Sequence, residues 1–471
     1  MSKYDVVIGL EIHSELSTAT KIFCRCRNGN ATLPNENVCP VCLGMPGSLP
    51  VVSRSAIEKT IMAGLAFDCT INNLCVFERK NYFYPDLPKG YQTTQNDYPI
   101  CLGGHIKLKS GKTIRLNRIH LEEDAGKLVH DEVRGETLID YNRGGTPLIE
   151  MVTEPDINSA DEAVEFLEEV RSRILFSGVS HARMEEGELR FDVNISLKPK
   201  GSKKFGNRVE MKNLNSFKMV ARAIEFEIKR QSALLDNGQP VIVETRKWND
   251  TREISTSMRT KEDLADYRYF PDPDQYPIKI TRENVAELRA KMPKLAHELR
   301  AELETLGLTE YESDILTREK SVALFFSDAL ALLGKKSANE LANWVLNDVL
   351  SRATNYEILL TPTQLVETIT LVNSNKVTRK NAPLLLDSLW GKPAQTADSV
   401  AKTLNILGGV DETTLKDLIN RLVLTHPDSV SQYAQIPDKV LTFFMGQIMK
   451  QTSGKADATL ARSLLQAHLE M

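Results

Sequence analysis

The sequence predicts an α+β protein, with a mostly antiparallel N-terminal domain followed by all-helical domains. Up to about residue 290, short runs alternate polar and apolar residues, as strands with one buried face do. Beyond a proline cluster at Pro271, Pro273 and Pro277, apolar residues recur at helical spacing instead. A chain of 471 residues is also too long for one ordinary core. We therefore expect three domains, at 1–290, 291–395 and 396–471.

The composition is that of a soluble globular protein, with 41% hydrophobic and 26% charged residues. A net charge of -4 argues against a generally basic nucleic-acid binder, although it leaves room for a local basic patch. No apolar run approaches the roughly 18 residues of a membrane span, and the N-terminus reads as a strand rather than a signal peptide. We expect a cytoplasmic protein with no membrane partner.

Residues 4–16 predict a strand whose two faces differ in chemistry. Because side chains alternate along a strand, Glu11, His13 and Glu15 share one face. The apolar face consists of Leu10, Ile12 and Leu16. A carboxylate and an imidazole two residues apart can hold a divalent cation. A half-exposed strand of an antiparallel sheet gives the same pattern, so the residues alone leave both interpretations open.

Four of the seven cysteines form two close pairs, Cys24 with Cys26 and Cys39 with Cys42. Two such pairs around a short loop can supply a tetrahedral thiolate set for a structural Zn²⁺. Free thiols are the alternative. The remaining cysteines lack such spacing and are expected in the interior: Cys69, Cys75 and Cys101.

Three loops of the first domain combine charged, polar and aromatic residues. Residues 79–86 could stack a ring and clamp phosphate, or could form an aromatic plug. Residues 120–127 gather three acids and a histidine, which favours either a metal site or a solvated turn. Residues 140–150 place an arginine beside two glycines and end on an acid.

Residues 188–197 give the clearest alternation, with a mixed-charge polar face that could simply face water or could line a concave site. Ser159 and Ser216 are expected to cap helices that end near Gly178 and Gly238. Further N-cap candidates lie in the helical part: Ser337, Thr361 and Thr396.

The common nucleotide-binding motifs are missing. Ser110 to Thr113 looks like the end of a P-loop, but Ile106 stands where the motif requires glycine. If the chain handles ATP, it must use a site built from scattered carboxylates, metal and basic residues.

These segments together resemble one family, the B subunit (GatB) of the glutamyl/aspartyl-tRNA amidotransferase. The resemblance is carried by residues 7–13, 79–86, 120–127, 143–150, 184–190, 212–217, 266–271 and 446–450. It implies a cradle domain, a helical domain and a YqeY-like tail domain. The implied reaction is ATP-dependent phosphorylation of Glu or Asp misacylated on tRNA(Gln) or tRNA(Asn), followed by amidation. Ammonia would come from an amidase subunit (GatA), and a small subunit (GatC) would complete a heterotrimer.

The resemblance also implies site residues. The Mg²⁺ and catalytic positions correspond to Glu11, His13, Glu123 and Glu150, with Asp192 and Glu210 as further candidates. Strict alternation puts Glu123 opposite His120 and Glu122, so the strand must bulge there if Glu123 faces the metal. Independently of the resemblance, the polar clusters themselves offer candidates for phosphate or substrate contacts: Lys80, Asn81, Tyr84, Arg143, Arg190 and Lys212.

The cysteine quartet matches the zinc-bearing form of the family. Its tail domain is expected to touch tRNA, and the candidates are Lys450, Lys455 and Arg462. Two other function classes compete: a noncatalytic tRNA-binding scaffold with structural ions, and a stand-alone metal hydrolase.

Overall fold

The computed structural model describes residues 3–29, 31–131, 133–260, 267–407, 410, 412–452 and 454–470. Asp266, the first residue of one segment that carries the resemblance, lies outside this range. The chain divides into two compact units, residues 1–295 and 296–471. Among the described helices, none is long and apolar enough to cross a bilayer.

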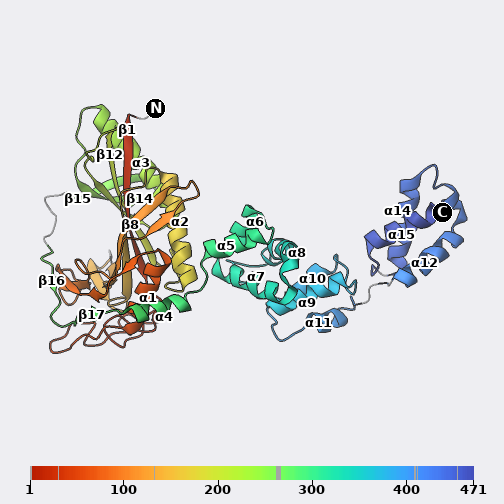
Figure 1. Cartoon of the computed structure of the whole chain (residues 1–471), viewed down its shortest axis with the longest axis horizontal. Helices are drawn as coiled ribbons and strands as arrows, with labels where there is room; N and C mark the ends of the chain where they lie inside the picture. Colours follow the sequence, from red (N-terminus) through yellow and green to blue (C-terminus); the bar gives the residue numbers. More distant parts are fainter. Residues whose placement is uncertain are drawn as a thin grey trace. The chain divides into compact units, whose positions relative to one another are not determined.

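A ten-stranded sheet forms the frame of the first unit (Figure 1). Its strand order is β15, β14, β13, β12, β1, β11, β8, β6 and β2, and β7 pairs with β8. All pairs are antiparallel except β13 with β14. The bounds are β1 (Tyr4–Glu15), β2 (Thr70–Ile71), β6 (Cys101–Leu102), β7 (His105–Lys107), β8 (Thr113–Glu123), β11 (Pro147–Thr153), β12 (Leu189–Pro199), β13 (Val209–Leu214), β14 (Glu244–Asn249) and β15 (Ile254–Thr260).

The expected alternation holds along β1. Ile8, Leu10 and Ile12 are buried, whereas Glu11 and His13 are half-exposed on the other face. The register then aligns polar residues across strands, because directly paired residues share a face. His13 pairs with Arg190 of β12 on one side and with Glu150 of β11 on the other. One face of the sheet is therefore apolar and the other is polar.

The apolar face is covered by helices α1 (Arg54–Ala66), α2 (Ala160–Ser177) and α3 (Phe217–Asp236). Ser159 caps α2 by accepting a hydrogen bond from the backbone N–H of Glu162, and Gly178 ends the helix with a left-handed φ of 74°. Ser216 caps α3 in the same way, through Met219 N–H. The sequence predictions for both helices are confirmed.

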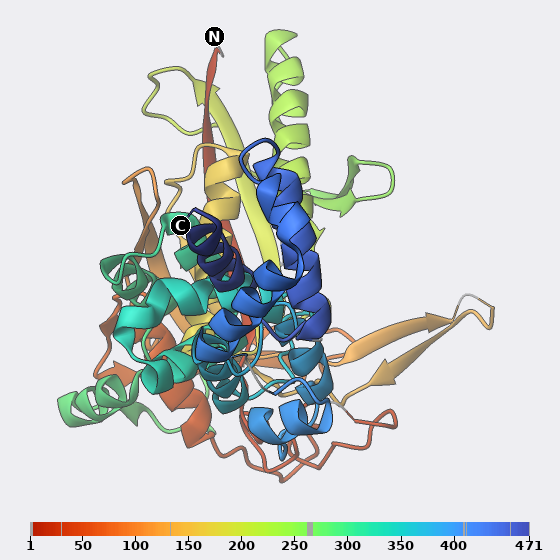
Figure 2. The same cartoon turned by 90° about the vertical axis from the view of Figure 1, so that its right-hand side faces the viewer.

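Smaller elements complete the first unit. A three-stranded sheet contains β4 (Glu78–Asn81), β5 (Tyr91–Thr94) and β16 (Phe270–Pro271), and β3 (Leu74–Cys75) pairs with β17 (Ile278–Lys279). The hairpin of β9 (Lys127–Asp131) and β10 (Glu136–Asp140) projects away from the main sheet (Figure 2). Helix α4 (Arg282–Lys291) follows β17.

The second unit is helical in the part that the structure describes, and it contains two hydrophobic clusters. One cluster extends from Leu303 to Ala401, and the other from Leu415 to Leu465. The helices are α5 (Ala296–Thr305), α6 (Glu310–Leu316), α7 (Lys320–Leu333), η2 (Lys335–Ser337), α8 (Ala338–Trp344), η3 (Val345–Val349), α9 (Pro362–Asn373), α10 (Ala382–Leu389), α11 (Ala397–Thr403), α12 (Glu412–Thr425), α13 (Pro427–Ser431), α14 (Pro437–Gln451) and α15 (Ala458–Leu469). The predicted α+β class, with helical domains after the sheet, is confirmed.

Of the three N-caps predicted in the second unit, the structure confirms two, at Thr361 and Thr396. Thr361 and Gln364 form a reciprocal capping box on α9, and Thr396 accepts from Ser399 N–H at the start of α11. Ser337 is wrong as a side-chain cap. It is the last residue of the 3₁₀ turn η2, its φ of -95° and ψ of 16° lie outside the extended region typical of an N-cap, and its hydroxyl makes no cap hydrogen bond.

Candidate functional site

The polar face of the main sheet forms the floor of a pocket of about 280 Å³. Side chains of β1, β8, β11, β12 and β13 meet there, and Lys80, Tyr267 and Tyr269 close it from the small sheet and the segment before β16. Acidic side chains in its lining are Glu11, Glu122, Glu150, Asp192 and Glu210. Basic and imidazole side chains are His13, Lys80, Arg118, His120, Arg208 and Lys212. We call this the acidic pocket.

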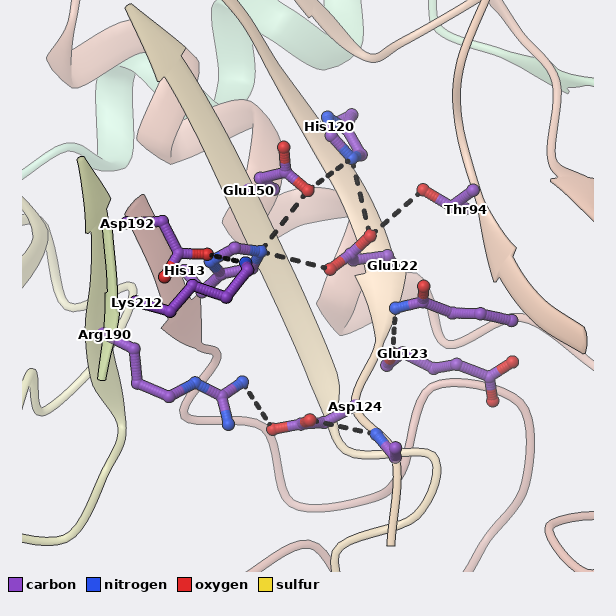
Figure 3. A network of polar contacts seen from close by, with 12 residues as sticks. His13, Thr94, His120, Glu122, Glu123, Asp124, Glu150, Arg190, Asp192 and Lys212 are labelled. Carbon is purple, nitrogen blue, oxygen red and sulfur yellow. Dashed lines mark hydrogen bonds and ion pairs between the residues drawn. The ribbon is translucent and has the colours of Figure 1, made fainter. Parts of the chain in front are cut away.

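His13, Glu122 and Glu150 form the first group of metal-capable residues in the acidic pocket (Figure 3). His13 Nε2 lies 3.4 Å from a Glu150 oxygen and 3.9 Å from a Glu122 oxygen. His120 Nε2 lies 3.5 Å from each of these two glutamates. One ligand atom from each member of the group falls within 4.8 Å of the others, close enough to share one cation.

The charges of this group depend on one another. Burial would lower the pKa of His13, but Glu150 and then Glu122 and Asp192 raise it to about 9. Burial would raise the pKa of Glu150, whereas His120, His13 and Lys80 hold it below its usual range. Glu150 is therefore an anion held among cations, which is the state in which a carboxylate can bind a metal ion.

The structure does not bring Glu123 into this group, although the resemblance placed it there. β8 pairs regularly with β11 at this point, Glu122 with Leu148 and Glu123 with Pro147, so alternation turns the two glutamates to opposite faces. Figure 3 shows Glu122 turned toward His13 and Glu123 turned away. Glu123 is instead paired with Lys89 and accepts a hydrogen bond of 2.9 Å from Thr93 N–H. The bulge that Glu123 required is not formed, and Glu122 takes its place.

Glu11, Asp192 and Glu210 form a second metal-capable group. Lys212 Nζ lies 2.5 Å from Asp192 and 2.9 Å from Glu210, and Asn194 donates to Glu11 at 2.8 Å. Burial and the charges of Glu150, Asp192 and Glu210 raise the pKa of Glu11. The acids of this group repel one another, and a bound cation would relieve that repulsion.

Two arginines predicted to contact phosphate have an acidic partner beside the acidic pocket. Arg190 donates to Asp124 at 2.7 Å, and Arg143 Nε lies 3.6 Å from the same carboxylate. Arg143 also donates to the carbonyls of Ala125 and Gly126. Burial would raise the pKa of Asp124, but Arg190 and Arg143 lower it. Neither arginine is among the residues that line the acidic pocket.

The candidates from residues 79–86 are separated by the structure. Lys80 lines the acidic pocket, and its ammonium lies 4.8 Å from the centre of the Tyr267 ring. Asn81 donates to the carbonyl of Arg268 at 2.8 Å, so its amide holds the neighbouring segment. Tyr84 is 59% exposed and does not line the acidic pocket.

Sequence reasoning did not assign a role to several residues that line the acidic pocket. Arg118, His120 and Glu122 could have been found from alternation along residues 118–123, which puts them on one face. Arg208, Tyr267 and Tyr269 carry no local signal, because only pairing between distant segments brings them to the acidic pocket.

The four clustered cysteines lie together, and their sulfurs fall within 4.8 Å of one another. Cys39 N–H donates to the Cys42 sulfur at 3.1 Å, and the buried ammonium of Lys21 lies 3.8 Å from the same sulfur. The hydrogen bond with Cys24 is the main cause that lowers the pKa of Cys42, to about 5, and Lys21 contributes. Four sulfurs, one readily ionised, fit the donor set of a closed Zn²⁺ site. Cys69, Cys75 and Cys101 are buried elsewhere, as predicted.

The tail candidates lie on and beside the last two helices. Lys450 is exposed on α14, Lys455 is half-buried after it, and Arg462 is exposed on α15. The Arg462 guanidinium lies 3.8 Å from Asp438.

Comparison with known proteins defines the class of the first unit. Residues 6–286 match the family model of the GatB/GatE catalytic domain, so the unit that carries the acidic pocket is an amidotransferase catalytic domain. Residues 325–469 match the model described as the GatB domain. The chain belongs to the GatB family, whose members are the B subunits of aspartyl/glutamyl-tRNA(Asn/Gln) amidotransferases.

Curated relatives that bear this family's name match over their whole length. The relative from Lachnospira eligens is 42% identical over 486 residues, covering 100% of both chains. The one from Persephonella marina is 42% identical over 479 residues, covering 99% of this chain and 100% of the relative. The one from Caldicellulosiruptor saccharolyticus is 41% identical over 480 residues, covering 99% of both. These relatives favour an enzyme subunit over a noncatalytic scaffold.

Proposed function

We propose that the chain is the kinase and transamidase subunit of a tRNA-dependent amidotransferase. It would convert Glu on tRNA(Gln), or Asp on tRNA(Asn), to the amide with ATP and ammonia. The observation that carries this proposal is the acidic pocket, where two metal-capable acid groups lie beside several basic side chains. The family membership supports the substrate, because the relatives bear the name of an aspartyl/glutamyl-tRNA amidotransferase subunit.

The reaction has two steps, because a free carboxylate is a poor electrophile. In the first step a side-chain carboxylate oxygen attacks the γ-phosphorus of ATP, and ADP leaves to give an acyl phosphate. In the second step ammonia attacks the acyl carbon, phosphate leaves and a proton is lost to give the amide. Both reactants of the first step are anions, so the site must neutralise charge as well as position them.

Residues of the acidic pocket supply much of this neutralisation. Lys80, Arg118 and Arg208 line it, and Lys80 is held over Tyr267 rather than paired with a single acid. Cations in this arrangement can bind phosphate oxygens while leaving the acids opposite them free for a metal ion. Tyr267 and Tyr269 cover the pocket from the other side, where they would exclude water from the acyl phosphate.

His13, Glu122 and Glu150 would hold one Mg²⁺, and Glu11, Asp192 and Glu210 offer a second oxygen donor set. When bound, Mg²⁺ supplies positive charge between the two anionic reactants. Lys212 already neutralises Asp192 and Glu210, so it competes with a cation at the second set.

Further roles follow from the same proposal. The cysteine cluster would hold a structural Zn²⁺, and an amidase subunit (GatA) and a small subunit (GatC) would complete the enzyme. The chain would divide into a cradle domain at 1–290, a helical domain at 291–395 and a YqeY-like tail at 396–471. Lys450, Lys455 and Arg462 would touch tRNA from the tail.

The test is phosphate release by the chain assembled with its partner subunits, given misacylated tRNA, ATP and Mg²⁺. Release should require glutamyl- or aspartyl-tRNA, and Glu150→Gln should reduce it by about 100-fold or more, because the substitution removes the charge at the centre of the site. Glu154→Gln, just beyond the same strand, is the matched control and should retain full release. Phosphate release that persists in Glu150→Gln would contradict the proposal.

A further inference from the structure

A strongly basic loop joins β12 to β13 in the first unit. Residues 200–208 contain three lysines, one arginine and no acidic residue: Lys200, Lys203, Lys204 and Arg208. We call residues 200–208 the lysine loop. The whole chain, in contrast, has a net charge of -4. A local concentration of positive charge on an otherwise acidic chain indicates a surface that attracts an anionic partner, because the fields of neighbouring like charges add.

The three lysines of the lysine loop are exposed, and their charges are not neutralised. Their side chains make no ion pair or hydrogen bond with any residue that the structure describes. Lys198, near the end of β12, differs from them. It pairs across the sheet with Asp5, and its ammonium lies 5.6 Å from the centre of the Phe205 ring. The positive charge of the loop itself is therefore available to a partner.

Backbone contacts hold the lysine loop in place. Lys200 N–H donates to the carbonyl of Lys3 at 3.1 Å, and Gly201 N–H donates to Asp5 at 3.0 Å, so the loop is tied to the start of β1 (Figure 2). A Cβ at Gly206 would overlap the backbone of β12, so only glycine lets this part of the loop approach the strand. The ammonium groups thus extend from a fixed backbone, which lowers the entropy lost when they bind a partner.

The lysine loop starts far from the acidic pocket and ends beside it. Along β12, Lys198 pairs with Asp5, whereas Arg190 pairs with His13. These two positions are eight residues apart, which is about 26 Å along an extended strand. At the other end of the loop, Arg208 lines the acidic pocket. Positive charge therefore continues from the far end of β12 to the acids that would hold the cation.

The C-terminal part of the chain offers no comparable attraction for an anion. Residues 396–471 contain seven lysines and arginines against eight aspartates and glutamates. Nonspecific attraction to a nucleic acid comes almost entirely from cations that neutralise its phosphates. In the proposed function the substrate is carried on tRNA, so the cations that attract its phosphates should lie outside residues 396–471. The lysine loop meets this requirement in the catalytic domain.

We infer that the lysine loop binds the phosphate backbone of the paired acceptor stem of the substrate tRNA. This inference rests on the proposed function. The amino acid of an aminoacyl-tRNA is attached to a single-stranded 3′ end that extends beyond the paired stem. When the amino acid lies in the acidic pocket, the stem must lie at a distance from that pocket, as the lysine loop does. Phosphate contacts of this kind position the duplex without reading its sequence.

The test measures binding of a tRNA(Gln) transcript to the full-length chain assembled with its partner subunits. One variant replaces the three exposed lysines together: Lys200→Gln, Lys203→Gln and Lys204→Gln. Its affinity for the transcript, measured by fluorescence anisotropy, should fall by about 10- to 100-fold. The plot of log affinity against log salt concentration should become shallower by about two to three, because each phosphate contact contributes about one to the slope.

A matched control removes three positive charges from exposed lysines on β7 and α3: Lys107→Gln, Lys218→Gln and Lys229→Gln. Its affinity should stay within about twofold of the unmodified complex, and its salt slope should not change. An RNA hairpin that contains only the acceptor stem and the 3′ end tests which part of the tRNA is bound. The lysine-loop variant should weaken the hairpin by the same factor as the whole transcript. Melting curves check that each variant is folded.

The outcomes separate the inference from the function on which it rests. Unchanged tRNA affinity in the lysine-loop variant, or an equal loss in the control, would overturn the inference and leave the phosphoryl-transfer proposal intact. If the transcript were weakened but the hairpin were not, the loop would bind another part of the tRNA and the inference would fail. Failure of the lysine-loop variant to assemble with the partner subunits would show a protein interface instead. If the unmodified complex bound no tRNA, both proposals would be contradicted.

Discussion

The cysteine cluster and the acidic pocket both gather metal-capable side chains in the first unit, but they are assembled differently. The sulfurs all come from one short segment, Cys24 to Cys42, whereas the acids come from β1, β8, β11, β12 and β13. Spacing along the chain is therefore enough to predict the cysteine site. The acidic pocket depends on strand register, so a shift of one residue exchanges the side chain that faces the pocket.

The two regions also differ in how their negative charge is neutralised. The acidic pocket is lined by four permanently charged bases and two histidines: Lys80, Arg118, Arg208, Lys212, His13 and His120. Near the sulfurs, Lys21 is fully buried, and its ammonium contacts the Cys42 sulfur and the carbonyl of Tyr141. A buried ammonium beside ionised sulfurs compensates their charge and ties the cysteine segment to the loop after β10.

The largest effect that would distinguish the two regions is loss of zinc. Cys39→Ser with Cys42→Ser should reduce bound zinc, measured by elemental analysis, from about one ion per chain to almost none, because a closed site needs all four ligands. Glu150→Gln should leave the zinc content unchanged although it stops phosphate release. Zinc retained in the double serine variant would refute the cysteine site.

A smaller effect should follow from Lys21→Met, which removes the ammonium but keeps an apolar chain of similar length. Zinc affinity, measured by competition with a chelator, should fall by about 10- to 100-fold, as is usual for loss of a group that supports metal ligands. Lys112→Met is the matched control, since Lys112 pairs with Glu162 on α2 and does not contact the cysteines. If Lys21→Met bound zinc with unchanged affinity, the charge of Lys21 would not be needed at the cysteine cluster.

Features that depend on neighbouring residues in the chain could be predicted from the sequence, whereas features that depend on pairing between distant strands could not. The cysteine set, the two faces of β1 and the caps at Ser159, Ser216 and Thr361 depend on neighbours in the chain, and the structure has them as expected. Arg208, Tyr267 and Tyr269 reach the acidic pocket only because distant segments pair in one register. Alternation along residues 118–123 puts Glu123 on the face opposite His120 and Glu122, whereas the resemblance assigned it to the metal.

The smallest expected effect concerns the cysteines outside the cluster. Cys75→Ala should lower the free energy of unfolding by about 1 kcal/mol, because it leaves a small cavity at a fully buried position. Denaturant unfolding measures this change, and zinc analysis of the same sample should show no loss. Zinc lost from this variant would mean that the metal is held by a different set of sulfurs.

Glu122, and not Glu123, lies with His13 and Glu150 in the structure, and we propose that these three residues hold the cation. Mn²⁺ can replace Mg²⁺ at oxygen-rich sites, so its binding, followed by electron paramagnetic resonance, tests the claim directly in Glu122→Gln and Glu123→Gln. We expect Glu122→Gln to weaken Mn²⁺ binding by about tenfold or more and Glu123→Gln to leave it within about twofold, with melting curves confirming both folds. Weaker binding in Glu123→Gln, with unchanged binding in Glu122→Gln, would contradict the account.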